Sequence, residues 1–182
     1  QTGDYNLSVR ELREKIKSKE YQRLDDNTKL KLINKEETVV SDFIKNPIVI
    51  RNKYNIDKES ITEKILQRLI LEDIPSFLKE LGEGFTFVEN EYKIKIGNTF
   101  NYIDLLLYNI KFNCYVVIEL KVTELKKEHI GQIQIYMNYV DKNIKTINQD
   151  KTIGVIICKK DNGYYIEYSS DNRIFSKNYI LS

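Results

Sequence analysis

The stretch from Tyr102 to Lys121 constrains the fold of this chain more than any other. It reads YIDLLLY, then a short polar turn NIKFN, then CYVVIELK. Both arms are almost wholly apolar and rich in β-branched and aromatic residues, a pattern typical of strands that are buried on both faces. The stretch therefore predicts two neighbouring strands in the core, joined by a turn.

Charged residues interrupt these two apolar strands. Asp104 lies within the first, and Glu119 and Lys121 lie near the end of the second, where alternation places them on one face. If the turn is centred between Lys111 and Phe112, antiparallel pairing sets Asp104 about opposite Glu119. Facing carboxylates repel, and carboxylates are rarely buried without a partner. A cation bound between them would resolve both problems.

The alternative to a metal site is an ordinary surface ion pair, which is the commoner origin of a Glu-x-Lys pattern. The context favours the metal site, because the charges interrupt runs that otherwise resemble core, and because Asp104 completes a set of hard oxygen ligands. The sequence contains no Gly-rich phosphate loop, Ser-His-Asp set or CxxC pair that would compete for the chemistry.

The residues before this stretch predict one long helix followed by a strand. Ser60 and Glu63 form a capping box, and the amphipathic pattern runs through Leu81, with a kink at Pro75 and an end at Gly82. From there the period changes to that of strands: FTFVENEYKIKIG is one strand, Gly97-Asn98 is a turn, and TFNYIDLLLY is the next strand.

The residues after Lys121 predict a second helix, from about Lys127 to Lys142. Its apolar stripe consists of Ile130, Ile133, Met137 and Val140. Gln132 and Tyr136 lie together on an adjacent face, and Gly131 is expected to allow close approach to the sheet.

Two further strands are expected near the end of the chain. TIGVIICKK predicts a buried strand, Asp161-Asn162-Gly163 a hairpin turn, and YYIEYS its partner. The tail RIFSKNYILS is expected to add an edge strand or to dock on a preceding domain. All elements together predict an α/β fold in which a helix, a three-stranded meander, a helix and further strands build a mixed sheet with helices on both faces.

Composition limits the function only loosely. The 182 residues carry 29 Lys and Arg against 27 Asp and Glu, so any nucleic-acid surface must come from local clusters of charge. Cys114 and Cys158 lie in apolar runs, and no apolar stretch is long enough for a signal peptide or a membrane span, so we expect a cytoplasmic location. His129, the single histidine, is interpreted as a surface residue at a helix N-terminus.

Asp, fourteen residues, then Glu-x-Lys, followed by a helix with Gln132 and Tyr136, resembles the PD-(D/E)XK nuclease superfamily. More narrowly, the chain resembles its YhcG-like branch through YIDLLLY, VVIELK, EHIGQIQIYMNYVD, KTIGVIICKK, IEYS and FLKELGEGFTFV. The resemblance covers roughly Lys58 to Ser170. It implies a restriction-endonuclease-like fold for a nuclease domain at 46–182, with the helical segment 1–45 as the end of a preceding N-terminal domain.

The resemblance implies a magnesium-dependent endonuclease, with DNA as the expected substrate and Mn²⁺ able to replace Mg²⁺. Asp104 and Glu119, helped by the carbonyl of Leu120, would hold one or two Mg²⁺ ions. Lys121 would orient the attacking water or neutralise charge on the phosphate. Gln132 and Tyr136 would help to position the water or the phosphate.

Some positions depart from the pattern of the branch. Gln67 stands where the branch usually has a helix glutamate, so Glu63, one turn away, and Glu72 are the remaining candidates for a helix carboxylate. At Glu89 to Glu91 the branch usually carries a Gly-Arg-Gln-like triplet, whereas this chain has Glu-Asn-Glu. The candidates for a phosphate-facing rim are Lys126, Lys127, Lys159 and Lys160.

Two alternatives remain open, the first because of these departures. In one, the domain is a weak or inactive nuclease fold that binds nucleic acid or a protein partner. In the other, the N-terminal helical segment mediates self-association. The chain begins at Gln1 rather than Met, so we expect it to be a fragment of a longer protein.

Overall fold

The structure is a computed structural model that describes residues 23, 25, 26, 28, 29 and 44–182. The helical segment expected at 1–45 lies almost entirely outside these residues. Within the described part, no helix combines the length and the apolar character that crossing a membrane requires.

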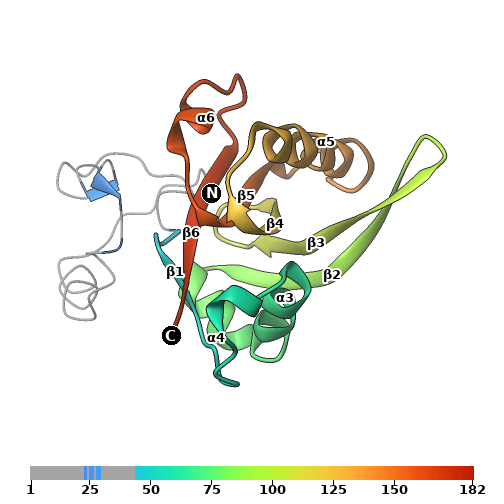
Figure 1. The fold of residues 1–182 in the computed structure, drawn as a ribbon. Coiled ribbons are helices and arrows are strands. Elements are labelled where there is room, and N and C mark those ends of the chain that lie inside the picture. Colours follow the sequence, from blue (N-terminus) through green and yellow to red (C-terminus); the bar gives the residue numbers. More distant parts are fainter. Residues whose placement is uncertain (1–22, 24, 27, 30–43) are drawn as a thin grey trace, which may run out of the picture.

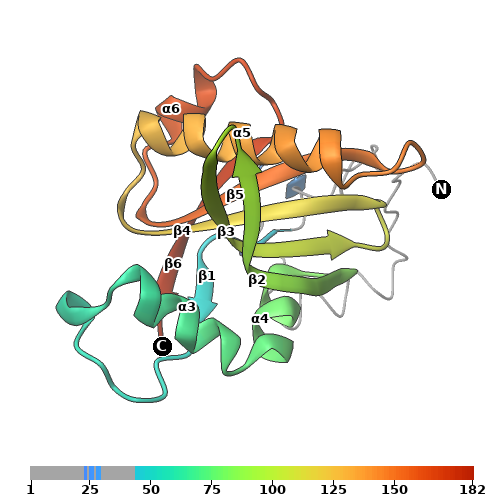
Figure 2. The ribbon, with the colours of Figure 1, turned by 90° about the vertical axis from the view of Figure 1, so that its right-hand side faces the viewer.

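A six-stranded mixed sheet forms the centre of the molecule (Figures 1 and 2). Its strands, in spatial order, are β1 (Ile48–Ile50), β6 (Ile174–Leu181), β5 (Asp150–Lys160), β4 (Cys114–Glu124), β3 (Thr99–Asn109) and β2 (Phe85–Ile96). The neighbours β2, β3 and β4 pair antiparallel, and β4, β5, β6 and β1 pair parallel. This arrangement confirms the predicted mixed sheet with its three-stranded meander.

Helices cover both faces of the sheet. In Figure 1, α3 (Glu63–Leu71) and α4 (Ile74–Leu81) lie on one side, and α5 (Lys127–Asn143) lies on the other. A short 3-10 helix, η3 (Lys58–Ser60), precedes α3, and α6 (Gly163–Glu167) precedes β6. The two apolar cores on either side of the sheet are therefore separate clusters, each closed by its own helices.

The two apolar strands of the sequence lie at the centre of this sheet as β3 and β4. Leu105 and Leu107 point into the core under α3 and α4, and Leu106 and Val117 point into the core under α5. All four side chains are fully buried. Burial on both faces explains why these strands read as continuous apolar runs.

The single helix predicted up to Leu81 is two helices. The helix does not begin at Ser60: Thr62 caps α3, and its Oγ1 accepts the N–H of Ile65. Asp73 caps α4 in the same way by accepting the N–H of Ser76. Pro75 therefore lies in the first turn of α4, where the N–H that proline lacks would have no partner within the helix. It does not kink a longer helix.

Helix α5 connects the parallel strands β4 and β5, which need such a crossover. Ile133, Met137 and Val140 are fully buried, as the apolar stripe predicted. The prediction for Gly131 is wrong, because this residue is exposed and a Cβ added there would meet nothing within 4 Å. The close approach occurs instead at Gly154 of β5, where a Cβ would lie 2.5 Å from the sulfur of Met137.

The predicted C-terminal hairpin is also wrong. The segment YYIEYS contains α6, and its tyrosines are half-buried or exposed. The partner of β5 is β6, which runs parallel to it and buries Ile174 and Tyr179. The strand β6 is not an edge strand either, since β1 pairs with it and forms that edge of the sheet.

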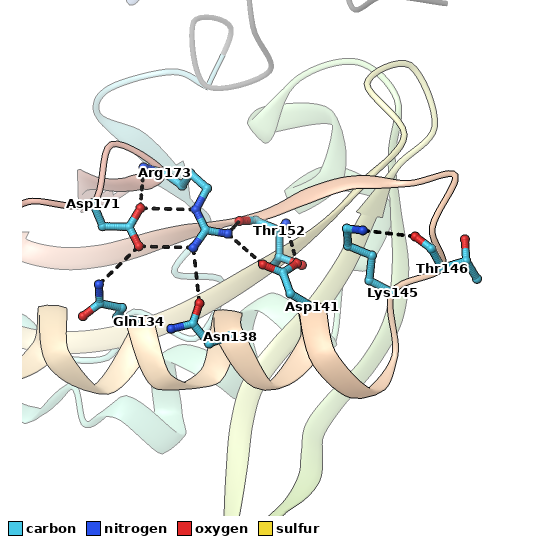
Figure 3. Close-up of polar contacts among 8 residues, drawn as sticks. All are labelled: Gln134, Asn138, Asp141, Lys145, Thr146, Thr152, Asp171 and Arg173. Atoms are coloured by element: carbon cyan, nitrogen blue, oxygen red, sulfur yellow. Dashed lines mark hydrogen bonds and ion pairs between the residues drawn. The ribbon is translucent and has the colours of Figure 1, made fainter.

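A guanidinium ties the segment before β6 to the rest of the domain (Figure 3). Arg173 Nη1 lies 2.8 Å from Asp141 Oδ2 of α5 and donates to the carbonyl of Thr152 in β5 at 3.1 Å. Its Nε lies 3.3 Å from Asp171 Oδ1, and its Nη2 donates to Asn138. One side chain thus joins three segments that are distant in sequence.

Candidate functional site

The site lies where β3 and β4 diverge. The pairing of these strands ends at Leu105 opposite Ile118, and the next position in this register sets Asp104 opposite Glu119, as the sequence predicts. Beyond this point β3 continues in partnership with β2 alone, as a two-stranded extension. The two carboxylates therefore stand in the fork between β4 and the extension.

Each carboxylate bonds to the backbone of the other strand. The N–H of Asp104 donates to Glu119 Oε2 at 2.9 Å, and the N–H of Leu120 donates to Asp104 Oδ2 at 2.8 Å. The side chains thus replace the carbonyl acceptors that a continued ladder would supply. The second oxygens, Asp104 Oδ1 and Glu119 Oε1, accept no hydrogen bond from the residues that the structure describes.

The two carboxyl groups disfavour one another's negative charge. Glu119 is only 3% exposed, and burial, with repulsion by Asp104 next, raises its pKa to about 8. Burial also raises the pKa of Asp104, although the N–H of Leu120 and the charge of Lys121 oppose the increase. A bound cation would reverse this balance and favour both carboxylates in their ionised forms.

Lys121 extends this set toward α5. Its Nζ donates to Gln132 Oε1 at 3.2 Å, and Gln132 Nε2 donates to the hydroxyl of Tyr136 at 3.2 Å. Among the described residues, no ion pair joins the Lys121 ammonium to Asp104 or Glu119, in contrast to the alternative of an ordinary ion pair. The structure therefore brings all five predicted catalytic side chains to one place.

The candidates for a helix carboxylate differ in how near they lie to the site. Gln67 of α3 is buried and donates through Nε2 to the carbonyl of Asp104 at 3.1 Å. Glu63, one turn earlier and exposed, is close enough for its charge to raise the pKa of both Asp104 and Glu119.

Glu72, the other candidate, stands apart from the site. It lies at the opposite end of α3, bonded to Tyr54 and 2.9 Å from the ammonium of Lys53. Among the described residues, no group of three or more His, Cys, Asp or Glu side chains could hold a metal ion, so the site offers two converging carboxylates.

Sequence reasoning missed the position of Glu91. The register of β2 and β3 pairs Asn90 with Leu105 and Tyr92 with Ile103, which brackets Glu91 opposite Asp104. Its backbone has a positive φ of 46°, and its charge contributes to the raised pKa of Asp104. Counting back from the Gly97-Asn98 turn would have found this third acid.

The four candidate rim lysines are exposed and gather at the same end of the sheet. Lys126 and Lys127 start α5, and Lys159 and Lys160 end β5. Parallel pairing of β4 with β5 places this end beside Lys121. His129 is half-buried at the start of α5, where its Nδ1 accepts the N–H of Lys126 and so caps the helix.

The donor set fits a hard divalent cation. Mg²⁺ in proteins usually keeps several waters and is held by one or two carboxylates. The buried carboxylate of Glu119 and the half-buried carboxylate of Asp104 converge here, and each keeps one oxygen that is not used by the backbone. Burial and the charge of Asp104 raise the pKa of Glu119, and the positive charge of Lys121 offsets them only in part.

Comparison with known proteins finds a matching family and a curated relative. Residues 41–181 match the family described as the YhcG PDDEXK nuclease domain. The Escherichia coli (strain K12) protein named "Putative nuclease YhcG" is 25% identical over 157 residues, which make up 83% of this chain and 41% of that protein. The chain therefore spans less than half the length of this curated relative.

Two solved structures are similar at low identity. A repair endonuclease from Pyrococcus abyssi is 16% identical with a TM-score of 0.45, over 65% of this chain and 47% of that chain. The structure described as an EndoMS-dsDNA2 complex is 18% identical with a TM-score of 0.48, over 68% of this chain and 48% of that chain.

Proposed function

The chain belongs to the YhcG PDDEXK nuclease domain family, and from this premise we propose that it is a metal-dependent endonuclease that hydrolyses phosphodiester bonds in DNA. The observation that supports the proposal is the pair Asp104 and Glu119 at the fork of β3 and β4, with Lys121 beside it. Family membership makes a nuclease the expected activity. The metal and the substrate are part of the proposal.

Asp104 and Glu119 would hold Mg²⁺, with the carbonyl of Leu120 as a further oxygen donor. When bound, the ion lowers the pKa of a coordinated water and stabilises negative charge that builds on the phosphate. Mn²⁺ is expected to replace Mg²⁺, because both accept carboxylate, carbonyl and water oxygens.

The remaining side chains act through position and charge. The ammonium of Lys121 cannot be a metal ligand, so its role is to stabilise charge on the phosphate or to orient the attacking water. Gln132 accepts from Lys121 and is itself fixed by Tyr136, which limits the rotation of the lysine side chain. Holding a charged group in place before the reaction reduces the cost of ordering it during the reaction.

Plasmid cleavage tests this proposal. The protein should nick or linearise plasmid DNA with Mg²⁺ or Mn²⁺ and leave it intact in EDTA, and an RNA of similar length serves as the alternative substrate. Lys121→Ala should abolish cleavage while calorimetry still detects Mg²⁺ binding, whereas Lys151→Ala, at the other end of β5, should keep full activity. Cleavage that persists in EDTA, or in the Lys121 variant, would contradict the assigned roles.

The second candidate function is binding of nucleic acid without efficient cleavage. Gln67 favours it, since this amide is bonded to the backbone of Asp104 at the place where the branch usually has an acid. In that case Gln67→Glu should create or raise Mg²⁺-dependent cleavage, with Gln67→Met as the control for loss of the hydrogen bond. If neither change affects cleavage, the second candidate loses its support.

The assignment of 1–45 to a preceding domain that mediates self-association is also a proposal. Sedimentation of the chain with and without residues 1–40 tests it, since only the longer form should associate.

A further inference from the structure

Beyond the site, β2 and β3 continue as a two-stranded extension that projects from the sheet. We name residues 92–103 the arm; Figure 1 shows it reaching outward past α5, and Figure 2 shows it rising in front of that helix. One face of the arm packs on the domain. Ile94 and Ile103 are fully buried in the same apolar cluster as Val140 of α5, with Tyr92 and Tyr139 beside them.

The opposite face of the arm carries two lysines and two aromatic rings. Lys93 pairs with Tyr102 and Lys95 with Phe100, which places all four side chains on one face. The ammonium groups of Lys93 and Lys95 lie 4.1 and 5.8 Å from the centre of the Phe100 ring. Phe100 is 52% exposed and Tyr102 49% exposed.

The arm carries a net positive charge. Residues 92–103 read YKIKIGNTFNYI and contain two lysines and no Asp or Glu. Exposed aromatic rings with lysines beside them match the two parts of a nucleic-acid strand, because lysines neutralise phosphates and aromatic rings stack on bases. The two lysines disfavour pairing of this face with the same face of a second copy.

The arm is continuous with the site. Tyr102 lies two residues before Asp104 on β3, about 7 Å along the strand. A nucleic-acid strand with a phosphate at Asp104 would therefore meet Tyr102, Lys93 and Phe100 in turn as it leaves the site. An aromatic ring can stack on a base only where no neighbouring base covers the face of that base. In a duplex, neighbouring bases cover these faces.

We propose that the Lys93, Lys95, Phe100 and Tyr102 face of the arm binds single-stranded DNA next to the cleaved bond. This inference rests on the proposed nuclease function and names its substrate: DNA with an unpaired segment beside the cleavage point. The lysines contact phosphates and bind any strand, whereas the two rings select unpaired bases.

Fluorescence anisotropy in EDTA tests the proposal without cleavage. The probes are a labelled 12-nucleotide single strand and a labelled 12-base-pair duplex, with the full chain. The wild type should prefer the single strand. Replacing Phe100 and Tyr102 together by Ala should weaken single-strand binding by about tenfold or more, in line with stacking of one or two bases, and should change duplex binding little.

Matched controls separate the arm from general surface effects. Tyr168→Ala removes a ring that is 84% exposed after α6, which lies well away from the arm in Figure 1, and it should change neither affinity. Lys93→Gln with Lys95→Gln should weaken both probes and reduce the salt slope by about one for each lysine. Lys151→Gln should leave the slope unchanged.

Several outcomes would overturn the inference. The first is equal affinity of the wild type and the aromatic double variant for the single strand. The second is an equal loss of affinity for single strand and duplex in that variant. The third is a change in its sedimentation without a change in affinity, which would make the arm an interface between copies. Binding and cleavage are separate readouts. A wild type that binds single strands through the arm but never cuts would reject the nuclease function and keep this inference.

Discussion

Asp104 and Glu119 are held where each makes the other's charge unfavourable. Their positions follow from the reciprocal bonds to the N–H groups of Leu120 and Asp104, which keep both carboxylates in the fork. A sequence selected only for stability would not place a half-buried carboxylate beside a buried one without a cation. This conflict can be measured in the metal-free protein.

Asp104→Asn should stabilise the metal-free protein at pH 8, by on the order of 1 kcal/mol. Asparagine removes one of the two charges and can still accept the N–H of Leu120 through Oδ1. Thermal unfolding in EDTA measures the effect. Mg²⁺ should raise the melting temperature of the wild type, because it binds the native state alone, and should not affect the variant, which should also not cut DNA.

The matched control is Asp150→Asn, which removes a charge at the far end of β5. It should leave the response to Mg²⁺ intact. A lower melting temperature for Asp104→Asn, together with a wild type that ignores Mg²⁺, would contradict the metal site.

The pKa of Glu119 predicts how metal-free stability depends on pH. The folded pKa of about 8 lies above the ordinary value of 4.5, so between these values the folded protein holds a proton that the unfolded chain has released. Stability is therefore fully present below about pH 4.5 and is lost as the pH rises toward 8, by at most about 1.4 kcal/mol per pH unit from this group. The raised pKa of Asp104 acts in the same direction.

Denaturant unfolding in EDTA at pH 6 and pH 8 checks this slope. Glu119→Gln should flatten it, because the amide does not titrate. A wild type that becomes more stable from pH 6 to pH 8 would show that Glu119 is ionised in the folded protein throughout this range.

At this scale the sequence predicts the position of the pair but not its surroundings. The apolar strands and the centre of their turn are enough to set Asp104 opposite Glu119. The bond from Gln67 to Asp104 could not be predicted, because it depends on how α3 packs on the sheet. The position of Glu91 opposite Asp104 could have been predicted in the same way, by counting paired residues from the turn at Gly97.

At the scale of elements, burial decides which predictions are confirmed. The strands β3 and β4 and the helix α5 have strong apolar patterns. The observed bounds of β3 and α5 agree with the prediction to within one residue, whereas β4 continues past Lys121 to Glu124. The break between α3 and α4 depends on Asp73, which caps α4. The amphipathic pattern continues through this break and therefore does not reveal it. The hairpin after β5 is wrong because β6 supplies the better buried partner, and this preference is visible only in the folded sheet.

Gly154→Ala tests the contact between α5 and β5. Its Cβ would lie 2.5 Å from Met137 Sδ and 3.0 Å from Ile133 Cδ1, so the helix must shift or its side chains must change rotamer. We expect a loss of roughly 1–3 kcal/mol in the free energy of unfolding, measured with urea.

Gly131→Ala is the matched control on the same helix. A Cβ there meets nothing within 4 Å, so the change should be neutral or should stabilise by up to about 1 kcal/mol through helix propensity. Equal effects of the two substitutions would show that Met137 moves freely.

At the scale of the molecule, Arg173 joins parts that the sequence gives no reason to connect. Its guanidinium reaches α5 through Asp141 and β5 through the carbonyl of Thr152, and its own loop through Asp171 (Figure 3). The side chain of Asp141 also accepts the N–H of Thr152 at 2.9 Å. The network therefore positions β6, and with it the edge of the sheet.

Arg173→Ala should lower the free energy of unfolding by about 2 kcal/mol, because it leaves Asp141 and Asp171 half-buried without their shared partner. Hydrogen exchange should also become faster at the start of β6. Arg68→Ala is the matched control: its side chain is 75% exposed and 3.5 Å from Glu72, so it should change stability by less than about 0.5 kcal/mol. Unchanged exchange in β6 would contradict the role of Arg173.

The pairing of β1 with β6 has a consequence for the order of events during synthesis. Ile48 emerges from the ribosome early, but its partner Tyr179 is translated only after the meander, α5 and β5 have been made. The strand β1 must therefore wait as an unpaired segment, while β2, β3 and β4 can pair as soon as each emerges. The edge of the sheet closes last, so a stalled or truncated chain that ends before β6 would expose β1 and the side of β5 that β6 covers.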